Sequence, residues 1–125
     1  MINRQATNDS PEVNFNIETK VFQIKGNSYP ENCGGLYEPI KSFIENYNIN
    51  EMGSLDFHCH FNLLNSTSSV HLAQIIMLLA EKKSKGLKCN VVWTYDEHDE
   101  EMLDLGEKLA SISKLDIQYK IELDD

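Results

Sequence analysis

The chain has 125 residues, which suits a single domain, and its hydrophobic and charged fractions of 41% and 25% are close to the averages of soluble globular proteins. Its formal net charge of −9 at pH 7 argues against nucleic acid or an anionic membrane surface as a partner, since contacts with phosphate groups require lysine or arginine. The longest apolar run, residues 75–80, is far too short to span a bilayer.

The N-terminal part of the chain predicts a β-hairpin after a polar lead. Residues 1–10 indicate a flexible lead without the apolar segment of a signal peptide. Apolar and polar residues alternate over residues 13–17, and apolar residues dominate again over residues 21–24. Because a short turn at residues 18–20 separates the two segments, we expect two strands paired as a hairpin.

A helix is predicted next, after a turn at residues 29–32. Apolar residues recur at helical spacing from Leu36 to Tyr47. Pro39 interrupts this segment, since proline has no amide hydrogen to donate inside a helix. The pattern therefore predicts either that the regular helix begins near Pro39 or that its opening turn is kinked there.

The second half of the chain alternates strands with helices. Residues 55–61 alternate apolar with polar side chains and predict a strand, and the wide apolar stripe over residues 70–80 predicts a helix. Residues 89–95 predict a further strand, and Asp96 is expected to open a third helix. The alternation over residues 115–121 predicts the last strand.

The predicted order of elements is therefore β-β-α-β-α-β-α-β. This order indicates one α/β domain over residues 11–125, with a mixed, mostly parallel sheet, right-handed crossovers, three main helices and the hairpin at one edge. Functional groups in such folds gather beyond the carboxyl ends of the strands. The first candidate site lies directly after such an end.

This candidate is the segment Asn65-Ser66-Thr67-Ser68-Ser69, at the junction of a predicted strand and a predicted helix. A helix N-terminus exposes unpaired backbone amides and the positive end of the helix dipole. The amides can donate hydrogen bonds to a phosphoryl group, and the dipole favours its negative charge. Phosphorylation there would change the surface charge by about −1.5 to −2. The alternative interpretation is an ordinary N-cap, because serine, threonine and asparagine are common capping residues.

The histidines and the acidic run suggest other chemistry. His58 and His60 share one face of a strand, and with His71 they provide the alternative of a small metal-binding protein or enzyme, although no third ligand lies at a recognised spacing. The acidic run over residues 96–101 suits the first turn of a helix, where Asp96 can cap, or a contact with a basic partner. Since no dinucleotide, nucleotide-binding or nucleophile-elbow motif is present, we expect no catalytic residue, no metal and no cofactor.

The three cysteines, Cys33, Cys59 and Cys89, contain no CxxC pair. They therefore predict neither a disulfide framework nor a zinc finger. Small core residues in a reducing, cytosolic compartment are the simplest interpretation.

Several segments, taken in this order and spacing, resemble the SiaC family of bacterial regulatory phosphoproteins from about Pro11 to the end of the chain. They are residues 26–32, 37–40, 64–69 and 93–102, followed by Gly106-Glu107. The resemblance implies a cytoplasmic, noncatalytic protein of a partner-switching module, with an architecture and a logic similar to those of anti-anti-sigma factors of the STAS type.

The resemblance also implies partners. A cognate Ser/Thr kinase would phosphorylate one hydroxyl of the segment after Asn65, and a PPM-type phosphatase would remove the phosphate. The unphosphorylated form would bind and activate a diguanylate cyclase, which raises cyclic di-GMP and promotes biofilm formation. By position the acceptor is Ser66, with Thr67 as the alternative because the family usually has threonine at the acceptor position. The family tends to place a basic residue after the serine run, where this chain has Val70 and His71.

The remaining residues that the resemblance assigns form a phosphate site or partner interface. They are Asn65, Thr67, Ser68, Ser69, Tyr29, Pro30, Glu31, Asn32, Asp96 and Asp99.

Overall fold

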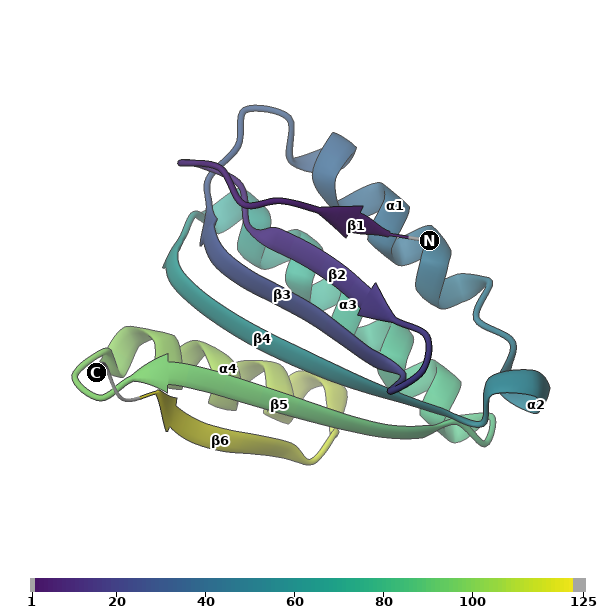
Figure 1. Ribbon diagram of the computed structural model, residues 1–125. Coiled ribbons are helices and arrows are strands. Elements are labelled where there is room, and N and C mark those ends of the chain that lie inside the picture. The colour runs from purple at the N-terminus through teal and green to yellow at the C-terminus, as the bar shows by residue number, and fades with distance from the viewer. Residues whose placement is uncertain (1, 123–125) are drawn as a thin grey trace.

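The structure is a computed structural model that describes residues 2–122, so the last three residues of the predicted domain lie outside it. Within the described residues, six strands form one sheet in chain order, with antiparallel pairing from β1 to β3 and parallel pairing from β3 to β6 (Figure 1). The strands are β1 (Asn3–Arg4), β2 (Glu12–Asn16), β3 (Val21–Ser28), β4 (Ser54–Leu64), β5 (Lys88–Asp96) and β6 (Ile117–Glu122). The helices are α1 (Cys33–Glu45), α2 (Ile49–Met52), α3 (Ser66–Ser84) and α4 (Glu100–Ser113). The predicted mixed, mostly parallel α/β sheet is confirmed.

The three long helices all cover the same face of the sheet, as Figure 1 shows. The strand order advances in one direction, so successive right-handed crossovers place α1, α3 and α4 on one side. Side chains that alternate toward this side, such as Phe22, Phe57 and Trp93, are fully buried. The other side of the sheet carries mainly polar side chains and no helix in the described part of the chain. We call it the open face.

The N-terminal residues differ from the sequence prediction. The sequence predicts residues 1–10 as a lead outside the domain, but Asn3–Arg4 pairs with β2 as an edge strand, and the amide of Phe15 donates to the carbonyl of Ile2 at 3.1 Å. Ser10 is also buried. A strand of two residues shows no alternation, so only its pairing partner could reveal it.

Two helices begin at positions other than those expected. The helix α1 begins at Cys33, so Pro39 lies well inside it rather than in its first turn. The carbonyl of Gly35, four residues before Pro39, therefore receives no helical hydrogen bond, but both residues are exposed to solvent, which can supply one. Asp96 does not open a helix, because it ends β5, and the cap of α4 is Asp99, whose Oδ1 accepts from the amide of Met102 at 3.1 Å.

The cysteines are buried and form no disulfide, which confirms their interpretation as core residues. Burial raises the pKa of the Cys89 thiol to about 11 and raises that of Cys59 still further. We expect both thiols to react far more slowly with a disulfide reagent at pH 8 in the native protein than in guanidinium, because only the thiolate attacks. Rapid labelling of both cysteines in the folded protein would contradict this arrangement.

No helix among residues 2–122 is long and apolar enough to cross a membrane.

Candidate functional site

The helix α3 begins one residue after β4 ends, and Asn65 forms the junction. Its side-chain Oδ1 accepts from the amide of Ser68 at 2.8 Å, and its carbonyl accepts from the amide of Ser69 at 3.0 Å. The amide of Asn65 donates to the carbonyl of Ser28 at 3.0 Å. Asn65 therefore caps α3 and also joins the ends of β4 and β3, and the hydroxyls after it are not needed as the cap.

The four hydroxyl residues after Asn65 have different environments. Ser66 and Thr67 are exposed, and each lies in the first turn of α3. Ser69 is half-buried, and its Oγ donates to the carbonyl of Asn65 at 3.1 Å. Ser68 has no exposed surface. Ser66 and Thr67 are therefore the most accessible of the four to an enzyme in solution, and Ser68 lies out of reach of a partner.

Ser68 instead belongs to a buried chain of hydroxyl groups. Ser28 Oγ donates to Ser68 Oγ at 2.9 Å, and the hydroxyl of Tyr37 lies 2.6 Å from Ser28 Oγ. Burial raises the pKa of the Tyr37 phenol. Because the one hydroxyl hydrogen of Ser28 goes to Ser68, the Tyr37 hydroxyl donates to Ser28. These contacts join the start of α3 to β3 and α1.

The loop over residues 29–32 lies beside the start of α3. The Cys33 thiol at the start of α1 is 3.4 Å from the carbonyl of Pro30 and 3.5 Å from Ser68 Oγ. Tyr29, Glu31 and Asn32 are exposed. The structure thus brings the predicted residues 29–32 and 65–69 together beyond the carboxyl ends of the parallel strands β3 and β4 (Figure 1).

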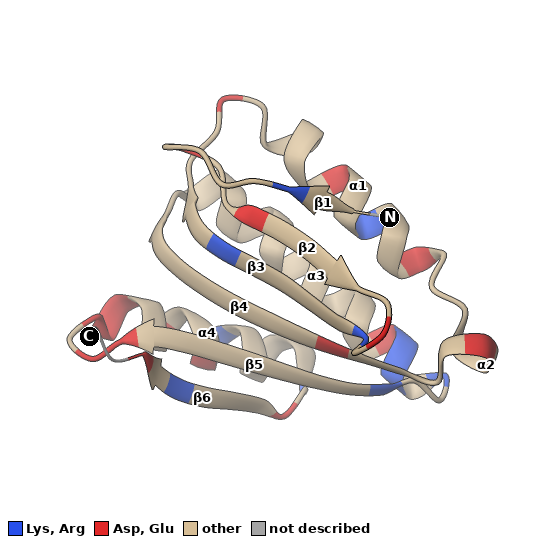
Figure 2. Ribbon diagram, in the orientation of Figure 1, with Lys and Arg blue, Asp and Glu red and all other residues tan. Residues whose placement is uncertain are grey.

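Asp96 and Asp99 are not joined to that cluster. Asp96 lies on the open face, where its Oδ2 accepts from Asn62 Nδ2 at 3.4 Å, and Asp99 caps α4. In residues 2–122, neither forms a hydrogen bond or ion pair with residues 65–69. Figure 2 shows acidic residues at the beginning of α4, at the same end of the molecule as the start of α3, and basic residues at the C-terminal end of α3.

The structure separates the three histidines of the metal-binding alternative. His58 and His60 lie on the open face, whereas His71 lies on α3, on the covered side. His71 stacks on Tyr37, with 5.5 Å between ring centroids. A site formed jointly by His58, His60 and His71 is therefore excluded, because the sheet lies between them.

Sequence reasoning missed a buried lysine that contacts α3 just beyond residues 65–69, which we call the acceptor segment. Lys41 on α1 is 8% exposed, and its Nζ lies 2.8 Å from His71 Nδ1 and 3.1 Å from Glu38 Oε1, with Gln74 Oε1 also in contact. His71 follows Thr67 by four residues on the same face of α3. The available signal was the position of Lys41 next to Ile40 and three residues before Ile44, within the apolar pattern of α1.

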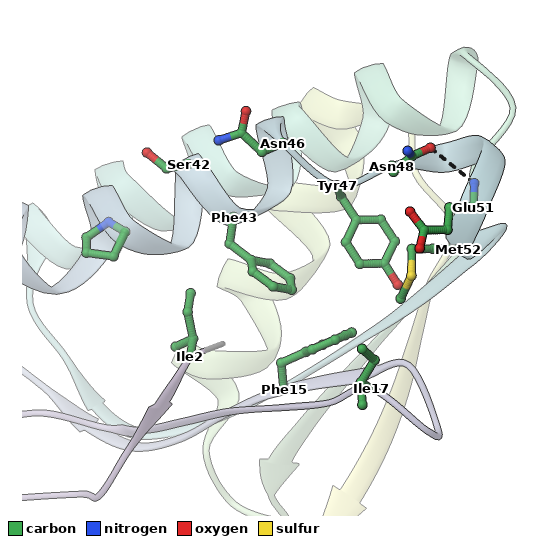
Figure 3. Close-up of a pocket in the computed structure, with 11 residues that line it drawn as sticks. Ile2, Phe15, Ile17, Ser42, Phe43, Asn46, Tyr47, Asn48, Glu51 and Met52 are labelled. Carbon is green, nitrogen blue, oxygen red and sulfur yellow. Dashed lines mark hydrogen bonds between the residues drawn. The ribbon is translucent and has the colours of Figure 1, made fainter.

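A separate apolar groove lies between the N-terminal strands and α1 (Figure 3). Phe15 approaches from β2, with Ile2 and Ile17 just outside β1 and β2, and Phe43 approaches from α1, with Tyr47 just after it. Its volume is about 360 Å³. None of the predicted site residues lines this groove, so it is distinct from the acceptor segment.

Comparison with known proteins identifies the family. The family model described as "SiaC family regulatory phosphoprotein" matches residues 4–122. The chain belongs to the SiaC family. Its SiaC-type domain also matches an uncharacterized protein of Pseudomonas aeruginosa strain UCBPP-PA14, with 24% identity over 102 residues, or 82% of this chain and 81% of that protein.

Solved structures share the fold of this SiaC-family chain. Apo-SiaC from P. aeruginosa matches with a TM-score of 0.84 and 20% identity over 98% of both chains. A chain in the crystal structure of the diguanylate cyclase SiaD in complex with its activator SiaC, also from P. aeruginosa, matches with a TM-score of 0.90 and 20% identity over 98% of this chain and 100% of that chain. At this identity the structural likeness shows the fold.

Proposed function

We propose that this chain is a noncatalytic, cytoplasmic regulatory phosphoprotein of a partner-switching module. A Ser/Thr kinase phosphorylates Ser66, with Thr67 as the alternative acceptor, and a PPM-type phosphatase removes the phosphate. The unphosphorylated form binds and activates a diguanylate cyclase or a similar output protein. Family membership supports this proposal, and so does the relative named as the activator of a cyclase. The observation that carries it is the exposure of Ser66 and Thr67 next to a fully buried Ser68.

A phosphoryl group on Ser66 would not require the fold to change. The Ser66 hydroxyl lies in the first turn of α3. There the phosphoryl oxygens can accept hydrogen bonds from backbone amides and interact favourably with the helix dipole. Neither Ser66 nor Thr67 belongs to the buried hydroxyl chain, so the core packing is retained. Phosphorylation thus changes the surface without altering the domain beneath it.

The same group would oppose partner binding. It adds a charge of about −1.5 to −2 to a protein whose net charge is already −9. A partner that covers residues 29–32 and 65–69 must remove this charge from water, which costs free energy unless a cation pairs with it. We therefore expect the phosphorylated form to release the output protein.

The first test measures binding of purified variants to the diguanylate cyclase of the host. Ser66→Ala is expected to bind as the unmodified chain does, and Ser66→Asp to bind about 10-fold or more weakly, which corresponds to 1.4 kcal/mol. Isothermal titration calorimetry provides the affinities. The matched control is Ser111→Asp, which adds a carboxylate at an exposed serine of α4.

Phosphosite mapping of protein purified from the host identifies the acceptor. Phosphate on Ser66 that a metal-dependent phosphatase removes would support the assignment, and phosphate on Thr67 would select the alternative. Equal affinities for Ser66→Ala, Ser66→Asp and the corresponding Thr67 variants would contradict the switch. An equal loss of affinity in Ser111→Asp would mean that net charge alone weakens binding.

A further inference from the structure

Three potential metal-ligating side chains meet on the open face, away from the acceptor segment. His60, Asp96 and Glu122 lie on the adjacent strands β4, β5 and β6, near the ends where these parallel strands finish. Each offers one ligand atom, and the three atoms lie within 4.8 Å of one another. Two of these residues, His60 and Glu122, also line a hollow of about 170 Å³ on this face.

The imidazole of His60 is held in place. The side chain is 6% exposed, and its Nδ1 lies 2.7 Å from Thr94 Oγ1 and 2.9 Å from Glu122 Oε2. Its Nε2 lies 3.8 Å from Asp96 Oδ1, which is too far for a hydrogen bond. The ring can give a single ion only one of its nitrogens, which is then the fixed ligand, and the carboxylate nearer the other nitrogen has to move toward that ion.

The two carboxylates can complete a coordination shell with small movements. Their side chains are 41% and 36% exposed, so neither is fixed by packing as the imidazole is. Zinc binds nitrogen and oxygen at about 2.0–2.2 Å, which places tetrahedral ligands roughly 3.3–3.6 Å apart. One ligand atom from each residue lies within 4.8 Å of the other two, so coordination requires shifts on the order of 1 Å, and water can fill the remaining position.

The charge of the cluster also favours a cation. The cluster places two carboxylate side chains beside one imidazole, and carboxylates are oxygen ligands that a divalent cation can bind. Lys25 Nζ lies 3.1 Å from Glu122 Oε1, whereas the second carboxylate oxygen, Oε2, faces His60. Lys25 thus acts as the present counterion of Glu122, and a metal ion would compete with it.

We propose that His60, Asp96 and Glu122 bind a divalent transition-metal ion of the zinc class on the open face of the sheet. An imidazole with carboxylates suits zinc and its neighbours better than magnesium or calcium, which prefer oxygen ligands alone. The bound ion joins β6 to the middle of the sheet through β4 and β5. The site shares no residue with the acceptor segment and is independent of the phosphorylation proposed above.

The test titrates zinc chloride into the full chain after treatment with a chelator. Calorimetry is expected to show one equivalent of zinc bound, and thermal unfolding to show a higher midpoint with zinc than without it. His60→Gln, Asp96→Asn and Glu122→Gln are each expected to weaken binding by about 10-fold or more. Lys25→Gln is expected to tighten binding, because it removes the competing cation.

His58→Gln is the matched control, since His58 shares the open face two residues before His60. It is expected to leave the affinity for zinc unchanged. Failure to bind one equivalent, retention of binding in His60→Gln, or an equal loss in His58→Gln would each overturn the proposal. Asp96→Asn and Glu122→Gln alter half-exposed side chains, so they test the site even if His60→Gln does not fold.

Discussion

Ser68→Asp is expected to destabilise the protein by at least about 3 kcal/mol, because it places a carboxylate in a buried position without a cation to pair with it. Ser68 has no exposed surface, and its Oγ accepts from Ser28 Oγ within the buried hydroxyl chain. Ser66→Asp is expected to change the free energy of unfolding by less than about 1 kcal/mol, since an exposed acid at a helix N-terminus is tolerated. Urea denaturation of the two variants measures the difference.

Ser68→Ala separates the loss of the hydroxyl from the burial of charge. It should cost about 1–2 kcal/mol, because Ser28 loses one buried hydrogen-bond partner. If Ser68→Asp and Ser66→Asp unfold at the same urea concentration, Ser68 is not buried as the structure places it. The comparison also guides the phosphorylation experiments, because loss of partner binding in a Ser68 variant would report unfolding rather than a switch.

Gly106→Ala is expected to destabilise the protein by about 1–3 kcal/mol through overpacking of the core. A Cβ at Gly106 would lie 2.7 Å from two atoms of the Trp93 ring, and that ring is fully buried. The Trp93 Nε1 donates to the carbonyl of Met102 at 3.0 Å, so the indole cannot move aside without losing this bond. Thermal or urea unfolding measures the loss, and the emission of Trp93, the one tryptophan in the sequence, reports any movement of the ring.

Gly34→Ala is the matched control for this substitution. Gly34 also lies in a helix, but a Cβ there would meet only Asn32 Oδ1, at an ordinary distance of 3.8 Å. Because alanine has the higher helix propensity, this variant is expected to be neutral or stabilised by up to about 1 kcal/mol. An unchanged stability and emission spectrum in Gly106→Ala would show that α4 does not pack closely on Trp93.

Element types followed from the sequence where a segment is long and periodic. The alternation of residues 55–61 and the apolar stripe of residues 70–80 each predicted an element that the structure contains as β4 and α3. The short elements escaped prediction, since β1 has two residues and α2 has four. Two to four residues carry too little periodicity to distinguish strand, helix and turn.

The start of α4 shows why element boundaries were harder to predict. Asp96 and Asp99 are both acceptable capping residues, and the sequence alone favours the first. The structure selects Asp99, because the backbone of Asp96 continues β5 and pairs with Glu122 on β6. A partner strand 26 residues away in the chain therefore decided which acid caps the helix.

For the candidate site, the sequence by itself determined that a polar, hydroxyl-rich segment lies where a strand ends and a helix begins. It did so because capping chemistry and apolar periodicity are local properties of the chain. Only the tertiary structure decided that Ser66 and Thr67 face solvent while Ser68 faces Ser28, that Lys41 reaches His71, and that Asp96 approaches His60 rather than the acceptor segment. These relations depend on the packing of elements distant in sequence, and no local pattern encodes which of four adjacent hydroxyls the neighbouring helix and strand will bury.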